Sequence, residues 1–141
     1  MVKLHLEVIT PEKVVFKDDI DELFAPTLTG QIGILPNHIE LLTKLHHGEL
    51  IIKNNNQKQS IAVFGGFLEI SNNKISILAD YAIHARDIDI SKSEEARNRA
   101  KELMQEKLNN SDFAKAESEL LRSLLELRIA TKHKRHNISN K

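Results

Sequence analysis

Histidines and carboxylates are the first side chains in this sequence whose types and spacing could do chemistry. The chain contains seven histidines, and His46 and His47 are adjacent. If both lie on a strand, their side chains point to opposite faces and cannot chelate one metal ion together. His38 and Glu40 could share a strand face, but two ligands do not make a metal site. The sequence therefore predicts no resident metal, and these histidines are interpreted as exposed or hydrogen-bonded groups.

Other catalytic signatures are missing from the sequence. It contains no nucleophile elbow, P-loop, dinucleotide fingerprint or HExxH pair. Gly65 and Gly66 stand in FGGFLE, where no helix follows to cradle a phosphate, so they predict a bulge or a close approach of two strands. Asp87 and Asp89 are placed to charge the N-terminus of a helix rather than to act as a catalytic pair. These features favour a binding protein over an enzyme, with no cofactor.

Length and composition narrow the class further. The 141 residues fit one average domain or two small ones, and the formal net charge is zero. The lack of cysteine excludes disulfides, thiolate catalysis and cysteine-based zinc sites. No apolar run reaches the roughly 18 residues needed to span a bilayer, and the N-terminus shows no signal peptide. Any work at a membrane is therefore expected to depend on partner proteins.

The first half of the chain has the period of strands. KLHLEVIT alternates apolar and polar residues, and short apolar runs recur up to about residue 79. Asn72 and Asn73, between GFLEIS and KISILA, predict a tight hairpin turn because asparagine tolerates positive φ. Many short strands at close spacing predict an all-β sandwich or barrel.

The period changes to that of helices near residue 88. Ser91 followed by Glu94 is a capping box, and apolar residues then recur at 3.6-residue spacing up to Leu108. NNSD at 109–112 breaks the pattern, and a second amphipathic segment follows. Its predicted apolar stripe consists of Phe113, Ala116, Leu120, Leu121, Leu124 and Leu127. The two segments predict an antiparallel helical hairpin, with alanines on the first apolar stripe and leucines on the second.

These patterns divide the chain into three parts. Residues 1–87 are expected to form the β domain, residues 88–132 the helical hairpin, and residues 133–141 a basic disordered tail. One apolar face per helix buries too little area to hold a two-helix hairpin alone. The hairpin must therefore pack on the β domain, bind another protein, or alternate between the two.

Three strings in the sequence resemble signatures of one protein family. GQIGILPNHIELLTKLHHGELII resembles the signature loop of the epsilon subunit of F-type (rotary) ATP synthases, FGGFLEISNNKISILAD its second signature, and IDISKSEEARNRA the start of its helical domain. The resemblance covers about residues 4–128. It implies a fold that is mainly β plus α, with a flattened β-sandwich of about ten strands followed by an antiparallel two-helix hairpin.

The resemblance also implies a role and partners. It describes a non-catalytic rotor subunit of the central stalk, whose sandwich binds the gamma subunit and stands on the ring of c subunits, and whose hairpin reaches the alpha and beta subunits. No nucleic acid is implied. Membrane contact is expected only through the complex, on the cytoplasmic face of the bacterial plasma membrane or the stromal face of a plastid thylakoid. The sequence does not decide between proton and sodium as the coupling ion.

The family places one loop against the c ring. Its counterparts in this sequence are Gly30, Gln31, Gly33, Pro36 and His38. The two glycines are expected to let the backbone turn tightly at the end of the sandwich, and Pro36 to stiffen it. The alternative for His38 is a local cap on the loop.

The second helix carries basic residues that the family uses for inhibition. Arg122, Arg128 and Lys132 correspond to residues that meet an acidic segment of the beta subunit, in an extended form that blocks ATP hydrolysis. The alternative is a solvated helix face on which they pair with Glu119 and Glu126, at little gain in stability.

Some family members bind ATP between hairpin and sandwich, and this chain retains part of that motif. The matching residues are Ile88, Asp89, Arg99 and Arg122. Four positions depart from it: Ile83, Lys92, Ser93 and Glu126. Lysine lacks the planar bidentate fork of the arginine expected there, and a glutamate repels phosphate. Nucleotide binding is therefore expected to be weak or absent.

Two functions from other classes fit part of the sequence. A small β-sandwich with a basic tail could be a nucleic-acid-binding accessory protein, which a steep salt dependence of binding would reveal. Aromatic residues make up only 4% of the chain, too few for a platform on which single-stranded bases stack. A metalloenzyme using His38, His46 and His47 would need tightly bound metal. Neither alternative accounts for the signature strings.

Overall fold

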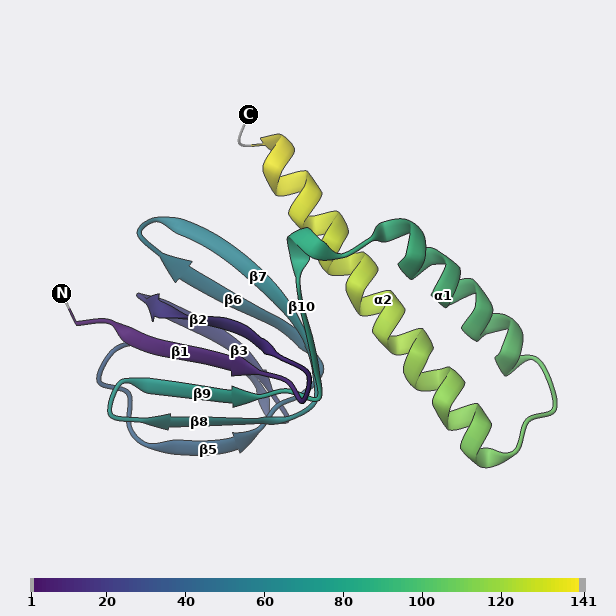
Figure 1. Cartoon of the computed structure of the whole chain (residues 1–141), viewed down its shortest axis with the longest axis horizontal. Coiled ribbons are helices and arrows are strands. Elements are labelled where there is room, and N and C mark those ends of the chain that lie inside the picture. Colours follow the sequence, from purple (N-terminus) through teal and green to yellow (C-terminus); the bar gives the residue numbers. More distant parts are fainter. Residues whose placement is uncertain (1, 140–141) are drawn as a thin grey trace. The chain divides into compact units, whose positions relative to one another are not determined.

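The computed structural model describes residues 2–139. The chain divides into two compact units after His84, three residues before the boundary that the sequence predicts. Figure 1 shows strands in the first unit and two helices in the second. The predicted sandwich of about ten strands followed by a two-helix hairpin is therefore confirmed within the described residues.

The strands of the first unit form two five-stranded sheets. In chain order they are β1 (Leu4–Ile9), β2 (Val14–Ile20), β3 (Glu22–Thr27), β4 (Gly30–Ile34), β5 (Leu41–Lys44), β6 (Gly48–Asn54), β7 (Gln57–Phe64), β8 (Phe67–Ser71), β9 (Lys74–Leu78) and β10 (Tyr81–His84). One sheet has the order β2-β1-β9-β8-β5 and the other β10-β7-β6-β3-β4. Neighbouring strands are antiparallel, except that β1 and β9 run parallel.

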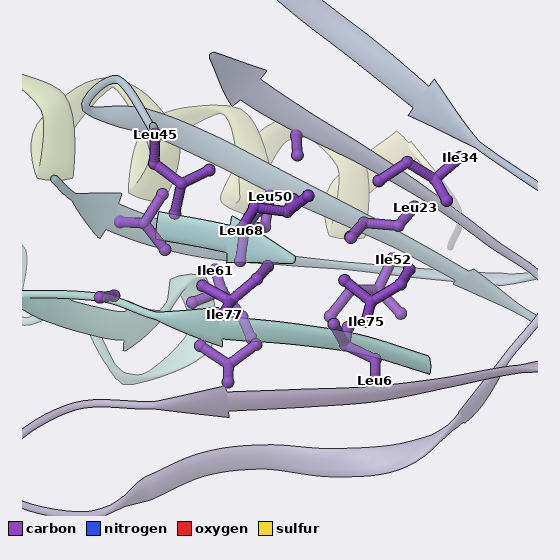
Figure 2. Close-up of a cluster of buried hydrophobic side chains, with 14 of the residues drawn as sticks. Leu6, Leu23, Ile34, Leu45, Leu50, Ile52, Ile61, Leu68, Ile75 and Ile77 are labelled. Carbon is purple, nitrogen blue, oxygen red and sulfur yellow. The ribbon is translucent and has the colours of Figure 1, made fainter. Parts of the chain in front are cut away.

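The core of the sandwich lies between the inner faces of the two sheets. Strand β1 alternates buried Leu4, Leu6 and Val8 with half-buried residues, as its period predicts. Figure 2 shows leucine and isoleucine side chains from both sheets in one cluster, among them Leu6 of β1 and Ile52 of β6, each 0% exposed. Burying one such side chain contributes roughly 1.5–3 kcal/mol, so the first unit has a sizeable core of its own.

Asparagine and glycine make the tight connections between strands. The asparagine pairs 55–56 and 72–73 connect β6 to β7 and β8 to β9, all with positive φ, which confirms the predicted hairpin at 72–73. At Gly66 a Cβ atom would overlap the backbone carbonyl oxygen of Leu78. The close approach of strands predicted for the glycine pair is therefore confirmed.

The second unit begins with a short 3-10 turn, η1 (Ala85–Asp87), followed by α1 (Ile90–Met104) and α2 (Asn110–Ser139). The two helices pack on each other as an antiparallel hairpin. None of the helices in the described part of the chain combines the length and the apolar character that crossing a bilayer requires.

Polar side chains before each helix satisfy its first N–H groups. The Asp89 carboxylate accepts a hydrogen bond from the N–H of Lys92 at 3.2 Å, and the Asn109 side chain accepts one from the N–H of Asp112 at 2.8 Å. The cap predicted at Ser91 is wrong, because Asp89 fills that role and Ser91 lies in the first turn of α1.

Helix α2 is longer than the sequence predicts. It continues to Ser139, so the disorder predicted from residue 133 is wrong for residues 133–139. This segment contains no glycine or proline and includes lysine and arginine, whose long unbranched side chains favour a helix. Residues 140 and 141 lie outside the described residues.

Candidate functional site

The turn before β4 carries the first residues predicted to face the c ring. Gly30 begins the strand with φ +121°, a conformation that favours glycine. The buried Thr27 hydroxyl donates to the Gly30 carbonyl at 2.6 Å and accepts from the Thr29 N–H at 3.3 Å. These bonds fix the turn and leave Leu28 at its tip 60% exposed.

Gly33 does not have the backbone role that the sequence predicts. It lies within β4, opposite Phe24 of β3, and its φ is not positive. A Cβ atom there would lie 3.2 Å from the Phe24 ring, so the ring limits the size of the residue. The prediction that both glycines turn the chain is therefore confirmed for Gly30 and wrong for Gly33.

A second turn follows β4 and is pinned to a neighbouring hairpin. Leu35 to His38 form a β-turn closed by a hydrogen bond from the His38 N–H to the Leu35 carbonyl at 3.2 Å. Asn37 has φ +68° and follows Pro36, the pattern of a type II turn. The Asn37 N–H donates to Asn73 Oδ1 at 2.6 Å, and Asn73 Nδ2 donates to Asn37 Oδ1 at 3.3 Å. Proline and this side-chain pair together hold the turn against the β8–β9 connection.

The predicted ring-facing residues lie at opposite ends of β4. Gly30 and Gln31 open the strand, whereas Pro36 and His38 follow its last residue, Ile34. A strand rises about 3.3 Å per residue, so the two turns are roughly 13 Å or more apart. The single loop that the sequence predicts is therefore wrong, because a strand separates its two halves.

The imidazole of His38 is engaged locally. Its Nδ1 donates to the backbone carbonyl oxygen of Ile39 at 2.7 Å, which places the proton on Nδ1 in the neutral form. The residue is half-buried. This geometry matches the local cap weighed as its alternative role, and a contact with a ring stays a prediction.

An apolar row crosses the outer face of the first sheet. Strand register places Val14, Ile9, Leu78 and Phe67 side by side on β2, β1, β9 and β8. Val14, Leu78 and Phe67 are each more than half exposed. Adjacent exposed apolar side chains mark interaction surfaces. The sequence did not reveal this row, because its members come from four separate segments.

Small side chains line the contact between the two helices. We call this contact the seam, made of Ser93 and Ala100 of α1 and Ala116, Ser123 and Ala130 of α2. Each of these residues is at most 4% exposed. Small residues allow two helix axes to approach closely, as the alanines of the first helix predict.

The leucine stripe predicted for α2 is wrong in part. Phe113, Leu121 and Leu124 are 39%, 42% and 43% exposed. Leu125 and Ile129, which the prediction leaves out, are at most 5% exposed. The spacing of the predicted stripe therefore misplaces part of the buried face of α2.

A polar contact crosses the seam. Ser93 Oγ donates to Glu126 Oε2 at 2.9 Å, and Glu126 Oε1 lies 3.4 Å from Nε of Arg122, one turn earlier on α2. The Glu126 side chain is 12% exposed and that of Arg122 is 45% exposed. We call these three residues the polar lock. In the sequence, Ser93 and Glu126 stand out only as departures from a nucleotide-binding motif. No sequence signal indicates that their side chains are in contact.

The residues that match the nucleotide motif have other roles within the hairpin. Nε of each arginine lies near a glutamate of α2, at 4.0 Å for Arg99 and 3.4 Å for Arg122. Ile88 is buried and Asp89 caps α1. The glutamates offset the positive charge that a phosphate would need.

The basic residues predicted to meet the beta subunit do not form one patch. Arg128 and Lys132 are four residues apart, so they neighbour each other on one exposed face of α2. Arg122 is six residues from Arg128, about 120° away around the helix. The structure therefore separates Arg122, which belongs to the polar lock, from the other two.

An ion-paired carboxylate joins the N-terminal strand to the β6–β7 turn. Lys3 Nζ lies 3.2 Å from Asp21 Oδ1 and donates to Asn54 Oδ1 at 2.6 Å. The Asn55 N–H donates to Asp21 Oδ2 at 2.8 Å. The backbone bond from Asn55, followed by the bond from Lys3, lowers the pKa of Asp21 below its ordinary value. This network ties three segments of the sandwich together.

The condition under which His46 and His47 would point apart, that both lie on a strand, does not hold. They lie between β5 and β6 rather than on a strand, so strand alternation does not apply, and their ring centroids are 3.9 Å apart. The His47 ring also stacks on Phe64 at 5.5 Å. Across the part of the chain that the structure describes, no three metal-ligating side chains come together. The His47 ring therefore contacts the rings of both His46 and Phe64.

Both units of the chain match models of known protein families. A family model described as "ATP synthase, Delta/Epsilon chain, beta-sandwich domain" matches residues 3–85, and one described as "ATP synthase, Delta/Epsilon chain, long alpha-helix domain" matches residues 86–131. The chain is 39% identical over 126 residues to the ATP synthase epsilon chain of Nitratidesulfovibrio vulgaris, covering 89% of this chain and 94% of that one. It is 40% identical over 131 residues to the epsilon chain of Chloroflexus aggregans, covering 93% and 94%.

A solved structure shares the fold. A chain of the Euglena gracilis mitochondrial ATP synthase, solved with OSCP, F1 and the c-ring, superposes with a TM-score of 0.77 at 19% identity, covering 94% of this chain and 83% of that chain. The two family models adjoin in the sequence and correspond to the sandwich and the hairpin. The relatives are about 40% identical over nearly the whole chain. This chain belongs to the family of ATP synthase epsilon chains.

Proposed function

We propose that this chain is the non-catalytic central-stalk (rotor) subunit of a proton-translocating F-type ATP synthase. It couples rotation of the c ring to the gamma subunit and restrains ATP hydrolysis through its C-terminal helices. The observation that carries the proposal is the match to both domains of the delta/epsilon chain, in order, across residues 3–131. Chains that share its fold come from ATP synthases solved with F1, a c-ring and a central stalk.

The sandwich is the attachment domain in this proposal. Its outer sheet face carries the apolar row of Val14, Ile9, Leu78 and Phe67. Apolar surface of this kind suits a lasting contact with another subunit, for which gamma is the candidate. The sandwich has its own core, so it can hold such a contact while the hairpin changes its position.

The two turns that flank β4 are separate candidates for the ring contact. Both turns present apolar side chains to solvent, Leu28 at the first and Leu35 and Ile39 at the second, but the second turn is pinned by Asn73 and uses the His38 imidazole locally. We therefore assign the ring contact to the Gly30–Gln31 end. Because the sequence contains no cysteine, Gln31→Cys and His38→Cys each introduce one thiol, and crosslinking to a cysteine in the c-subunit loop compares the two ends.

The hairpin is the regulatory part. Arg128 and Lys132 form an exposed basic face on α2, which suits an acidic segment of the beta subunit. The glutamates beside Arg99 and Arg122 oppose phosphate, so the inhibition is expected to depend little on ATP. Calorimetry of the isolated subunit should show no ATP binding at micromolar concentrations, and a micromolar dissociation constant would contradict this part.

Co-purification tests the proposal as a whole. We propose that the complex lies on the cytoplasmic face of a bacterial plasma membrane, with the stromal face of a plastid thylakoid as the alternative, and that this chain is held there by its partners. A tagged chain purified from detergent-solubilised membranes should bring gamma, c, alpha and beta subunits with it. Recovery of the chain without gamma and c would contradict the rotor assignment.

A further inference from the structure

The polar lock places a mostly buried carboxylate in the contact between the two helices. Glu126 has only 12% of its side chain exposed, and Ser93 is 4% exposed. A carboxylate that leaves water is strongly destabilising unless hydrogen bonds and a counter-charge compensate it. Ser93 supplies a hydroxyl donor from the opposite helix, and Arg122 supplies the positive charge from the same helix.

Packing of small side chains alone does not fix how the two helices are aligned. Ser93 and Ala100 stand seven residues apart on α1, so a shift of two helical turns exchanges one small residue for another. In that shifted alignment Ala100 would face Glu126, and the carboxylate would lose its hydroxyl donor. Of these two alignments, only the observed one gives the Glu126 carboxylate a hydroxyl donor from α1, just as one buried polar residue selects the register of a coiled coil.

Two other polar contacts in the described part of the hairpin do not supply the same constraint. Arg99 and Glu119 also face each other across the helices, but at 4.0 Å and with side chains 63% and 43% exposed, where ion pairs contribute little. The buried Ser123 hydroxyl donates to the Leu120 carbonyl of its own helix at 2.9 Å, so it does not cross the seam.

We infer that Glu126 is a positioning residue: through Ser93 it holds α1 in a single register on α2, and opening of the hairpin requires this contact to break. The lock makes the closed hairpin a defined state with a discrete opening step rather than two helices that slide along each other.

A double-mutant cycle in the full-length isolated chain tests the inference. Ser93→Ala, Glu126→Ala and the double variant are compared by hydrogen–deuterium exchange of the α1 amides. A hydrogen bond to a charged group is worth roughly ten- to a hundredfold in an equilibrium constant, so each single change should raise α1 exchange about tenfold or more. The double variant should exchange no faster than the faster single variant, because both changes break one contact. Additive effects, or rates equal to the unchanged chain, would overturn the inference.

Two controls separate the lock from general damage to the fold. Glu119→Ala makes the same substitution on the same helix at the exposed pair, and it should change α1 exchange less than about twofold. Glu126→Gln keeps an oxygen that can accept from Ser93 while removing the charge, so it should recover part of the protection lost in Glu126→Ala. Amides of the sandwich report whether the chain is folded. An effect of Glu119→Ala equal to that of Glu126→Ala would overturn the special role of Glu126.

A distance measurement tests the register itself. Lys101→Cys and Ser118→Cys place spin labels on exposed positions of α1 and α2 in a chain that otherwise has no cysteine. With the lock intact the distance distribution should have one narrow peak, and Ser93→Ala should broaden it or add a second peak. An unchanged narrow peak in Ser93→Ala would show that packing alone sets the register.

The consequence for ATP hydrolysis rests on the proposed function. If the hairpin inhibits when it opens, Ser93→Ala in the assembled complex should lower ATPase activity relative to Glu119→Ala. Changed exchange in the isolated chain with unchanged ATPase activity would contradict the regulatory role while supporting the lock. Unchanged exchange would overturn the lock whatever the ATPase activity.

Discussion

The sandwich and the helical hairpin differ in the side chains that pack inside each of them. Large residues such as Leu6, Ile52 and Ile61 are 0% exposed in the sandwich core, whereas Ala100 and Ala116 fill the seam of the hairpin. Large apolar side chains contribute several times more burial free energy than alanine. The sandwich core is therefore expected to resist opening more strongly than the seam, and under the proposed function the seam is the part that a partner opens.

The largest expected effect breaks the sandwich side of this comparison. Leu6→Ala removes a fully buried side chain, and Leu→Ala changes at such sites cost about 2–5 kcal/mol of unfolding free energy. Chemical denaturation of the isolated chain, followed by a signal from the sandwich, measures the loss. Leu42→Ala is the matched control, because Leu42 is 70% exposed and should change stability by less than about 0.5 kcal/mol. Equal losses for the two variants would show that the core does not carry the stability of the sandwich.

A second change tests the close approach of strands at the glycine pair. Gly66 has φ +114° and no room for a Cβ atom, whereas Gly30 has φ +121° with nothing within 4 Å of that position. Gly66→Ala should cost about 3 kcal/mol or more from strain and overlap together, and Gly30→Ala about 1–2 kcal/mol from strain alone. Thermal denaturation of both variants gives the difference. If Gly30→Ala were the more destabilising change, the overlap at Leu78 would not matter.

A third change breaks the hairpin side. Ala100 is 0% exposed, so Ala100→Leu overfills the seam and should cost the closed hairpin about 1–3 kcal/mol. Hydrogen exchange should rise along α1 and α2 while the sandwich amides stay protected. Slower exchange in the variant would mean that the seam has room to spare and that small residues are not needed for the close approach.

The smallest expected effect is a pH dependence inside the sandwich. The hydrogen bonds from Asn55 and Lys3 lower the folded-state pKa of Asp21, so its contribution to stability is fully present above the unfolded pKa of about 3.9. It is lost as the pH falls from there through the lower folded pKa. Asp21→Asn should therefore reduce stability slightly at neutral pH and shrink the loss of stability below about pH 4. Identical acid denaturation curves for the two proteins would show that the network has no energetic role.

Much of the fold follows from local sequence signals. The alternation in β1 and the asparagine pair at 72–73 depend on neighbouring residues, and both were predictable. Gly30 and Gly33 show the limit of this reasoning. They are the same residue three positions apart, yet the turn gives one a positive φ and the partner strand gives the other an aromatic neighbour.

The candidate sites were less predictable because they depend on contacts between distant segments. Ser93 and Glu126 are thirty-three residues apart, and only the antiparallel packing of α1 and α2 brings them to 2.9 Å. The spacing of apolar residues predicts a helix and its apolar face, but it does not predict a contact between Ser93 and Glu126. The helical repeat alone predicts that Arg122 and Arg128 lie on different sides of α2. The family resemblance instead treats them as one set of basic residues.

ATP hydrolysis by the assembled complex tests the central claim most directly: the sandwich attaches the chain and the hairpin restrains the enzyme. The chain truncated after Asp87 keeps the entire sandwich core and loses both helices. Complexes carrying the truncated or the full-length chain should contain equal amounts of it, and the truncated form should hydrolyse ATP faster. A complex that retains the truncated chain but hydrolyses ATP at the full-length rate would contradict the inhibitory role of the hairpin. A truncated chain that folds but fails to join the complex would contradict the role of the sandwich.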